Sequence, residues 1–101
     1  MMNVPWVGLC EVKPLSGNDA LAGAAGAFVN VVALGRTAED FENMACAALR
    51  SCDFEVLSVA DVGTVEEREQ RGDLVQELGQ LAGFLTEEGP VRFDEFQAYE
   101  R

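Results

Sequence analysis

The stretch AFVNVVALGRTAEDFENMACAALRSCDFEVLSVADV, residues 27–62, decides the fold of this chain. Its apolar and β-branched runs predict a strand over Ala27–Leu34 and a second strand over Phe54–Val62. Between them, Ala38–Ser51 has the apolar spacing of an amphipathic helix. A strand, a helix and a strand joined by so few residues indicate a compact β-α-β unit, and therefore a fold that combines a sheet with helices.

The start of this helix can be read from its residues. Thr37 is a good N-cap, because its hydroxyl can accept from the backbone amide three residues later, where Asp40 can reach back as in a capping box. Cys46 lies off the apolar stripe, so we expect it to be partly exposed. The stripe itself, which we expect to cover the sheet, consists of Phe41, Met44, Ala45, Ala48, Leu49 and Cys52.

Two segments precede this unit. Val4–Val12 is rich in apolar residues with poor alternation, which predicts a strand covered on both faces, within the chain or by a partner. Lys13–Ala25 has the glycine, proline and asparagine content of a loop, and its length makes it our candidate for a functional loop.

The C-terminal third predicts one more helix and one more strand. The helix runs from about Leu74 to Glu87 with Asp73 as its cap, and the strand covers Val91–Tyr99. A bulge near residues 94–95 would place the apolar side chains of this last strand on one face. Thr64–Gln70 fits either a short edge strand or a helical turn capped by Thr64, and we favour the strand.

The order of these elements, from residue 27 onward, is similar to the ferredoxin-like βαββαβ arrangement, preceded by one extra N-terminal strand. We therefore expect a single α+β domain over residues 1–101, a two-layer sandwich with two helices packed on one face of a four- to five-stranded sheet. The other face would then need a cover, which predicts a homodimer through the sheet.

Composition limits the function. The chain of 101 residues is 49% hydrophobic and has a formal net charge of −11. Residues 1–50 contain three basic and five acidic side chains, whereas residues 51–101 contain four basic and thirteen acidic ones. Because nucleic acids and anionic membranes require clustered Lys and Arg, we expect neither as a partner.

The residue types exclude much familiar chemistry. The chain has no histidine, which removes the usual neutral-pH base and histidine-activated nucleophiles. No Cys-x-x-Cys pair, calcium loop or phosphate-binding glycine pattern is present, so we expect no metal and no cofactor. Three cysteines without an export signal predict a cytoplasmic protein, and Cys46 could be reactive only if its thiol pKa were low.

We therefore expect a small acidic protein-interaction or regulatory module without catalytic activity, such as an inhibitor or immunity-type protein that docks on a basic partner. The candidate partner-binding residues are Glu66, Glu67, Glu69, Asp73, Glu77, Asp94 and Glu95. The first alternative is a dimeric small-molecule-binding domain with Lys13, Ser16 and Asn18 in its ligand loop. The second is a carboxylate-dependent enzyme, which would need a buried carboxylate or Tyr99 in an apolar pocket.

Overall fold

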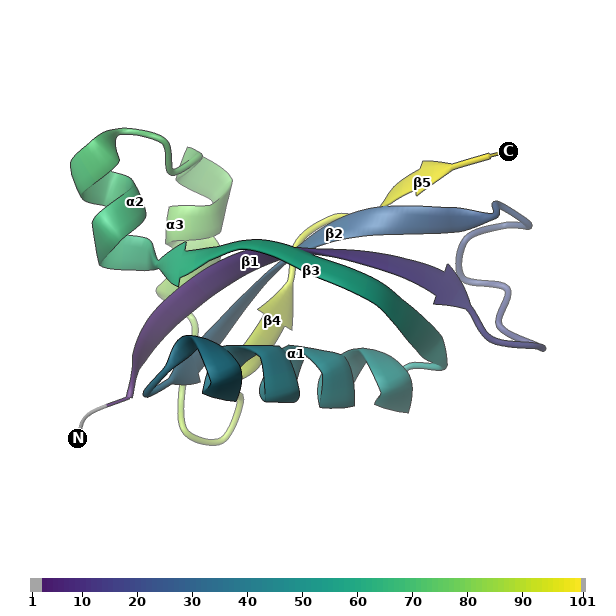
Figure 1. Cartoon of the computed structure of the whole chain (residues 1–101), viewed down its shortest axis with the longest axis horizontal. Helices are drawn as coiled ribbons and strands as arrows, with labels where there is room; N and C mark the ends of the chain where they lie inside the picture. Colours follow the sequence, from purple (N-terminus) through teal and green to yellow (C-terminus); the bar gives the residue numbers. More distant parts are fainter. Residues whose placement is uncertain (1–2, 101) are drawn as a thin grey trace.

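A five-stranded antiparallel sheet organises the part of the chain that the computed structural model describes, residues 3–100 (Figure 1). Its strands are β1 (Val4–Pro14), β2 (Gly26–Gly35), β3 (Phe54–Thr64), β4 (Val91–Phe93) and β5 (Gln97–Tyr99). The order across the sheet is β3-β1-β2-β4, and β5 pairs with the far end of β2. The α+β class is therefore confirmed, with the two long central strands β1 and β2 at the middle of the sheet.

Three helices lie on this sheet: α1 (Ala38–Ser51), α2 (Val65–Arg71) and α3 (Gln76–Ala82). The segment 64–70, for which we favoured a strand, forms α2, so that interpretation was wrong. The place between β2 and β3 is occupied by the N-terminal strand β1. The pairings thus do not confirm the ferredoxin-like order.

The first helix begins and covers the sheet as predicted. Thr37 is its N-cap, and its hydroxyl accepts a hydrogen bond from the amide of Asp40. The carboxylate of Asp40 accepts from the amide of Arg36, one residue before the cap, at 3.1 Å. Phe41 and Leu49 on the predicted stripe are fully buried, whereas Cys52, which we placed on that stripe, is exposed at the C-cap.

The second helix is explained by its own capping box. The Thr64 hydroxyl accepts from the amide of Glu67, and the Glu67 carboxylate accepts from the amide of Thr64. Gly72 ends the helix in the left-handed conformation that glycine adopts without strain. These bonds give acceptors to the amides of Thr64 and Glu67, which have none within the helix itself, and so favour a helix over a strand here.

The third helix is shorter than predicted. It covers residues 76–82, and its N-cap residue, Val75, makes no side-chain cap bond. Asp73, expected to be the cap, forms an ion pair with Arg71 at 3.1 Å, so this prediction was wrong. Gly83 is the C-cap, and the chain beyond it turns before β4.

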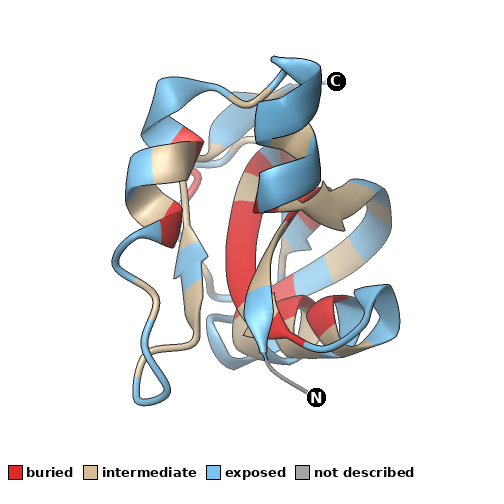
Figure 2. Cartoon of the chain, turned by 90° about the vertical axis from the view of Figure 1, so that its left-hand side faces the viewer, coloured by how far each residue is buried: buried red, intermediate tan, exposed pale blue. Residues whose placement is uncertain are grey.

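The helices lie on opposite faces of the sheet, which overturns the expectation that both would cover one face (Figure 1). The α1 face holds the larger core, in which helix residues such as Phe41 pack on Cys10 and Val29. On the second face, residues of α2 and α3 pack on Val7 and Val32. Buried residues accordingly concentrate in the strands between the two helical layers (Figure 2).

The last two strands line up along β2. Val31 pairs with Phe93 and Ala27 pairs with Ala98, which places Phe93 and Ala98 on the α1 face. Phe96, in the connection between them, stacks on Phe54 with ring centroids 5.1 Å apart. Residues 94–96 divide the predicted strand Val91–Tyr99 into β4 and β5, so the prediction of one bulged strand was wrong, although Phe93 and Phe96 both pack against the α1 core as expected.

Candidate functional site

Four of the predicted partner-binding carboxylates lie on α2 and α3, and a fifth, Asp73, lies in the connection between the two helices. We call this set, all of whose members are exposed, the acidic helical surface: Glu66, Glu67, Glu69, Asp73 and Glu77. The two helices are neighbours, because Val65 of α2 and Leu78 of α3 share one core cluster (Figure 1). The structure does not bring Asp94 and Glu95 onto these helices but places them in the β4–β5 connection, where the Asp94 amide donates to Asn30 of β2.

Two members of the acidic helical surface also have bonds within the chain. The Glu67 carboxylate accepts from the side chain and the backbone of Thr64, and these hydrogen bonds lower the pKa of Glu67 below its ordinary value. Asp73 is paired with Arg71. Glu66, Glu69 and Glu77 are therefore the carboxylates best placed to meet another molecule.

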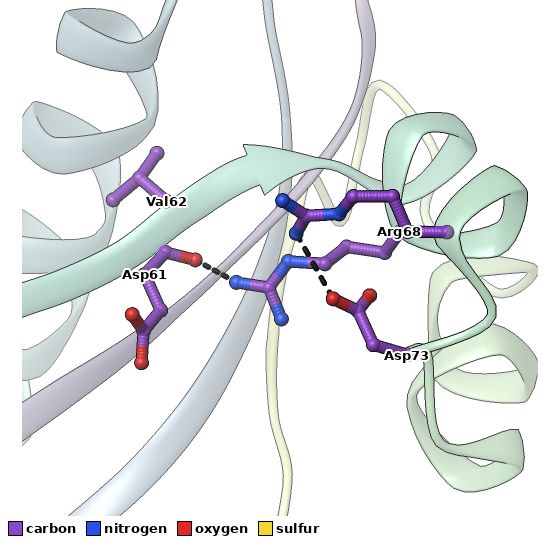
Figure 3. Close-up of a pocket in the computed structure, with 5 residues that line it drawn as sticks. Asp61, Val62, Arg68 and Asp73 are labelled. Carbon is purple, nitrogen blue, oxygen red and sulfur yellow. Dashed lines mark hydrogen bonds and ion pairs between the residues drawn. The ribbon is translucent and has the colours of Figure 1, made fainter.

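Arg68 turns away from this surface toward the end of β3 (Figure 3). Its guanidinium donates to the carbonyl oxygen of Asp61, a residue with a left-handed backbone at φ 55°. Its Nε is buried and has no hydrogen-bond partner within residues 3–100. A depression of about 400 Å³ lies here between Asp61, Val62, Arg68, Arg71 and Asp73. Arg71 and Asp73 form an ion pair here, and Arg68 ties α2 to the irregular end of β3 through the carbonyl oxygen of Asp61.

The predicted ligand loop does not form one site. Asn18 uses its amide group to hold the loop against the end of α1, donating to the carbonyl oxygens of Cys52 at 3.2 Å and Asp53 at 2.8 Å. Its Oδ1 accepts from the amide of Ala20. Ser16 is exposed on the loop, and Lys13 belongs to β1. Asn18 therefore has a structural role in the loop.

Lys13 lies instead on the second face of the sheet, in a depression of about 340 Å³ lined by Lys13, Ala25, Leu57 and Tyr99. The Tyr99 hydroxyl donates to Oε2 of Glu11 at 2.6 Å, and its ring lies 5.4 Å from that of Phe28. Phe28 and Leu57 are 40% and 43% exposed. We call Phe28, Leu57 and Tyr99, with the adjoining depression, the uncovered patch.

Gly26 makes this arrangement possible. A Cβ at this position would stand 2.5 Å from the Tyr99 hydroxyl oxygen and 2.7 Å from the carbonyl oxygen of Val12. Only a residue without a side chain lets the tyrosine lie across β2 and reach Glu11 on β1. The sequence separation of 88 residues between Glu11 and Tyr99 explains why inspection of the sequence missed this pair.

The three cysteines differ in burial. Burial, and then the nearby Cys46 and Glu42, raise the pKa of the Cys10 thiol to about 11, so it stays protonated at neutral pH. Cys46 is half-buried, Cys52 is exposed and all three thiols are free. Within residues 3–100 no group of three metal-ligating side chains occurs, and no Asp or Glu is buried.

None of the helices in the described part of the chain combines the length and the hydropathy that a membrane crossing requires. Comparison of the chain with protein-family models, with curated proteins and with solved structures finds no match. The acidic helical surface and the uncovered patch are therefore the two surfaces considered for function.

Proposed function

We propose that this chain is a non-catalytic interaction module that binds a basic protein partner, in the manner of an inhibitor or immunity-type protein. The observation that carries the proposal is the exposure of Glu66, Glu69 and Glu77 on two short helices at one end of the molecule. Their negative charges are part of the formal net charge of −11 of the whole chain. Such a surface attracts a basic partner over a distance of about 8–10 Å and speeds its encounter.

The carboxylate-dependent enzyme has less support. It needs an acid in an apolar pocket, and none of the described Asp and Glu side chains is buried. Tyr99 is half-buried and its hydroxyl already donates to a carboxylate. With three free thiols, we propose the cytoplasm as the location of the module.

Charge reversal tests the proposal. The triple variant Glu66→Lys, Glu69→Lys, Glu77→Lys is compared with a matched triple variant, Glu39→Lys, Glu42→Lys, Glu87→Lys, which changes the charge equally at other exposed positions. The probes are defined ten-residue peptides with five lysines or arginines, followed by calorimetry and by amide chemical shifts.

We expect the first variant to bind at least about tenfold more weakly and the matched variant to lose much less, because nearby charges dominate at physiological salt. Equal losses would reduce the effect to total charge and overturn a defined docking surface. Binding that is unchanged in both variants would overturn the proposal altogether.

A second candidate function, small-molecule binding by a dimer, is favoured by the depression beside Lys13 and Tyr99. An apolar anion would place its charge at Lys13 and its body on Leu57. Thermal shift with a panel of aromatic and aliphatic carboxylates tests the ligand, and sedimentation tests the dimer. Each copy has a net charge of −11, so two copies would repel each other. We therefore rank a basic partner above a second copy.

A further inference from the structure

The second face of the sheet carries two surfaces, one toward each end of the molecule. The helices α2 and α3 cover the end that contains Val7 and Val32, and they carry the acidic helical surface. Beyond them the sheet continues into the uncovered patch, where Phe28 and Leu57 are about two-fifths exposed. Figure 1 shows α2 and α3 at one end of the sheet and β5 at the other end. A partner that binds both surfaces would therefore lie along the sheet.

Carboxylates lie close to the aromatic rings of the uncovered patch. The rings of Phe28 and Tyr99 stand 5.4 Å apart at 43°, so they present more than one ring surface. The Tyr99 hydroxyl donates to Oε2 of Glu11, so this carboxylate lies beside the rings. Glu55 lies on the next strand and makes one long contact of 3.7 Å with Lys13, both side chains being about half exposed.

We infer that the uncovered patch binds an arginine side chain of the basic partner; this inference rests on the proposed function and names the anchor residue. A guanidinium stacks on aromatic faces and donates to carboxylates through its planar set of N–H groups. It would therefore contact both the rings of the patch and the carboxylates beside them. Arginines that enter such partly desolvated sites contribute most of the affinity at many interfaces. The acidic helical surface then steers the partner and the patch anchors it.

The charges around the patch favour this occupant over the others. Among residues 3–100, Glu11 accepts from the Tyr99 hydroxyl and Glu55 contacts Lys13, so two carboxylates and one cation border the patch. An anionic ligand would meet both carboxylates, and a second copy would bring another Glu11 and Glu55 to the same place. The exposed Lys13–Glu55 contact is a weak obstacle, because such pairs contribute little and can exchange their partners.

The test is a titration of the whole chain, labelled with ¹⁵N, with N-acetyl-Gly-Arg-Gly-amide. The matched probe replaces arginine by citrulline, which keeps the shape and removes the charge. We expect the arginine peptide to shift amides of β2, β3 and β5 next to the patch and to bind at least about fivefold more tightly than the citrulline peptide. The variant Phe28→Leu with Tyr99→Leu should lose about fivefold in affinity.

Two single variants discriminate between the occupants. Lys13→Gln removes the competing cation and should strengthen arginine binding about twofold, whereas it would weaken an anion that used Lys13. Glu55→Gln should weaken arginine binding about threefold, and Glu87→Gln, the same charge change between α3 and β4, should alter it by less than about 1.5-fold. Dispersed amide spectra and unchanged thermal unfolding establish that each variant is folded.

Several outcomes would overturn the inference. Shifts confined to α2 and α3 would reject the patch and leave the proposed function standing, whereas the absence of binding by any basic probe would reject both. Stronger binding of the citrulline peptide, or weaker arginine binding by Lys13→Gln, would show that the patch does not select a guanidinium group. Sedimentation as a dimer, with patch resonances that depend on protein concentration, would assign the patch to a second copy.

Discussion

The two faces of the sheet are covered in different ways. On one face, α1 lies along the strands and buries a continuous core in which Phe41, Ala45 and Leu49 are inaccessible to solvent. On the other face, two short helices bury a small cluster at one end and leave the uncovered patch at the other. The comparison indicates a separation of roles: the first face contributes the larger core, and the exposed side chains of the second face are the ones that we propose bind a partner.

The largest test of this separation is an aromatic deletion on each face. Phe41→Ala should lower the free energy of unfolding by about 3–5 kcal/mol, because it leaves a cavity in a closed core. Phe28→Ala should cost less than about 1.5 kcal/mol, since Phe28 is 40% exposed. Urea unfolding followed by circular dichroism measures both, and equal losses would show that the second face is as important for stability as the first.

The next test concerns how tightly Tyr99 is held. Gly26→Ala should cost about 1–3 kcal/mol, because the new methyl group meets both the tyrosine and the backbone of Val12. Gly63→Ala is the matched change, since its nearest neighbour would be Nε of Arg68 at an ordinary 3.7 Å, and it should be neutral or slightly stabilising. If Gly26→Ala is also neutral in urea unfolding, the tyrosine is not fixed across β2.

The helices of the second face can be tested through their local capping. Thr64→Ala should lower stability by about 1 kcal/mol, because it leaves the amide of Glu67 without its acceptor. The corresponding change on the first face is Thr37→Ala, which removes the acceptor of the Asp40 amide. Similar losses in urea unfolding would mean that both faces unfold as one unit. Loss of the α2 amide signals alone in Thr64→Ala would mean that the second face opens separately.

The pH dependence of Glu67 gives a smaller effect with a definite sign. Its pKa is lowered in the folded chain by the bonds from Thr64, so its contribution is present above the ordinary Glu value of about 4.3 and is lost as the pH falls through the lower folded pKa. Urea unfolding of the wild type and of Glu67→Gln between pH 7 and pH 3 should therefore converge at the acid end. A difference that grows toward low pH would contradict the capping bond.

The smallest expected effect is at the rim of the uncovered patch. Lys13→Ala and Glu55→Ala should each change stability by less than about 0.5 kcal/mol, and a double-mutant cycle should give a coupling near zero, because the pair is long and exposed. A coupling above about 1 kcal/mol in urea unfolding would mean that this rim belongs to the folded core.

Much of the local structure was accessible from the sequence. The strands 27–34 and 54–62 and the helix 38–51 were placed within two residues of the observed bounds, because periodicity and the Thr37 cap act over a few neighbours. The capping box at Thr64 was also visible, but the charge of the segment favoured a strand. Asp73 was taken for a cap because it stands before an apolar run, while Arg71 was close enough to pair with it.

The candidate site was only partly accessible. The carboxylates of α2 and α3 were identified as a group, but Asp94 and Glu95 were added although the structure places them on another segment. Lys13 was identified for its neighbouring loop, whereas its neighbours in the patch are Leu57 and Tyr99. The pair Glu11–Tyr99 joins the two ends of the chain, so no short sequence pattern could have revealed it.

By itself, the sequence located the strands β1, β2 and β3 and the start of α1, and it showed that the molecule is acidic without a histidine. Tertiary structure alone decided that β1 enters the middle of the sheet, that α2 and α3 pack opposite α1, and that one end of the second face stays open. The physical reason is the distance along the chain over which each interaction acts. Propensity, capping and periodicity depend on neighbouring residues, whereas strand order and the choice of face depend on which apolar surfaces meet after distant segments come together.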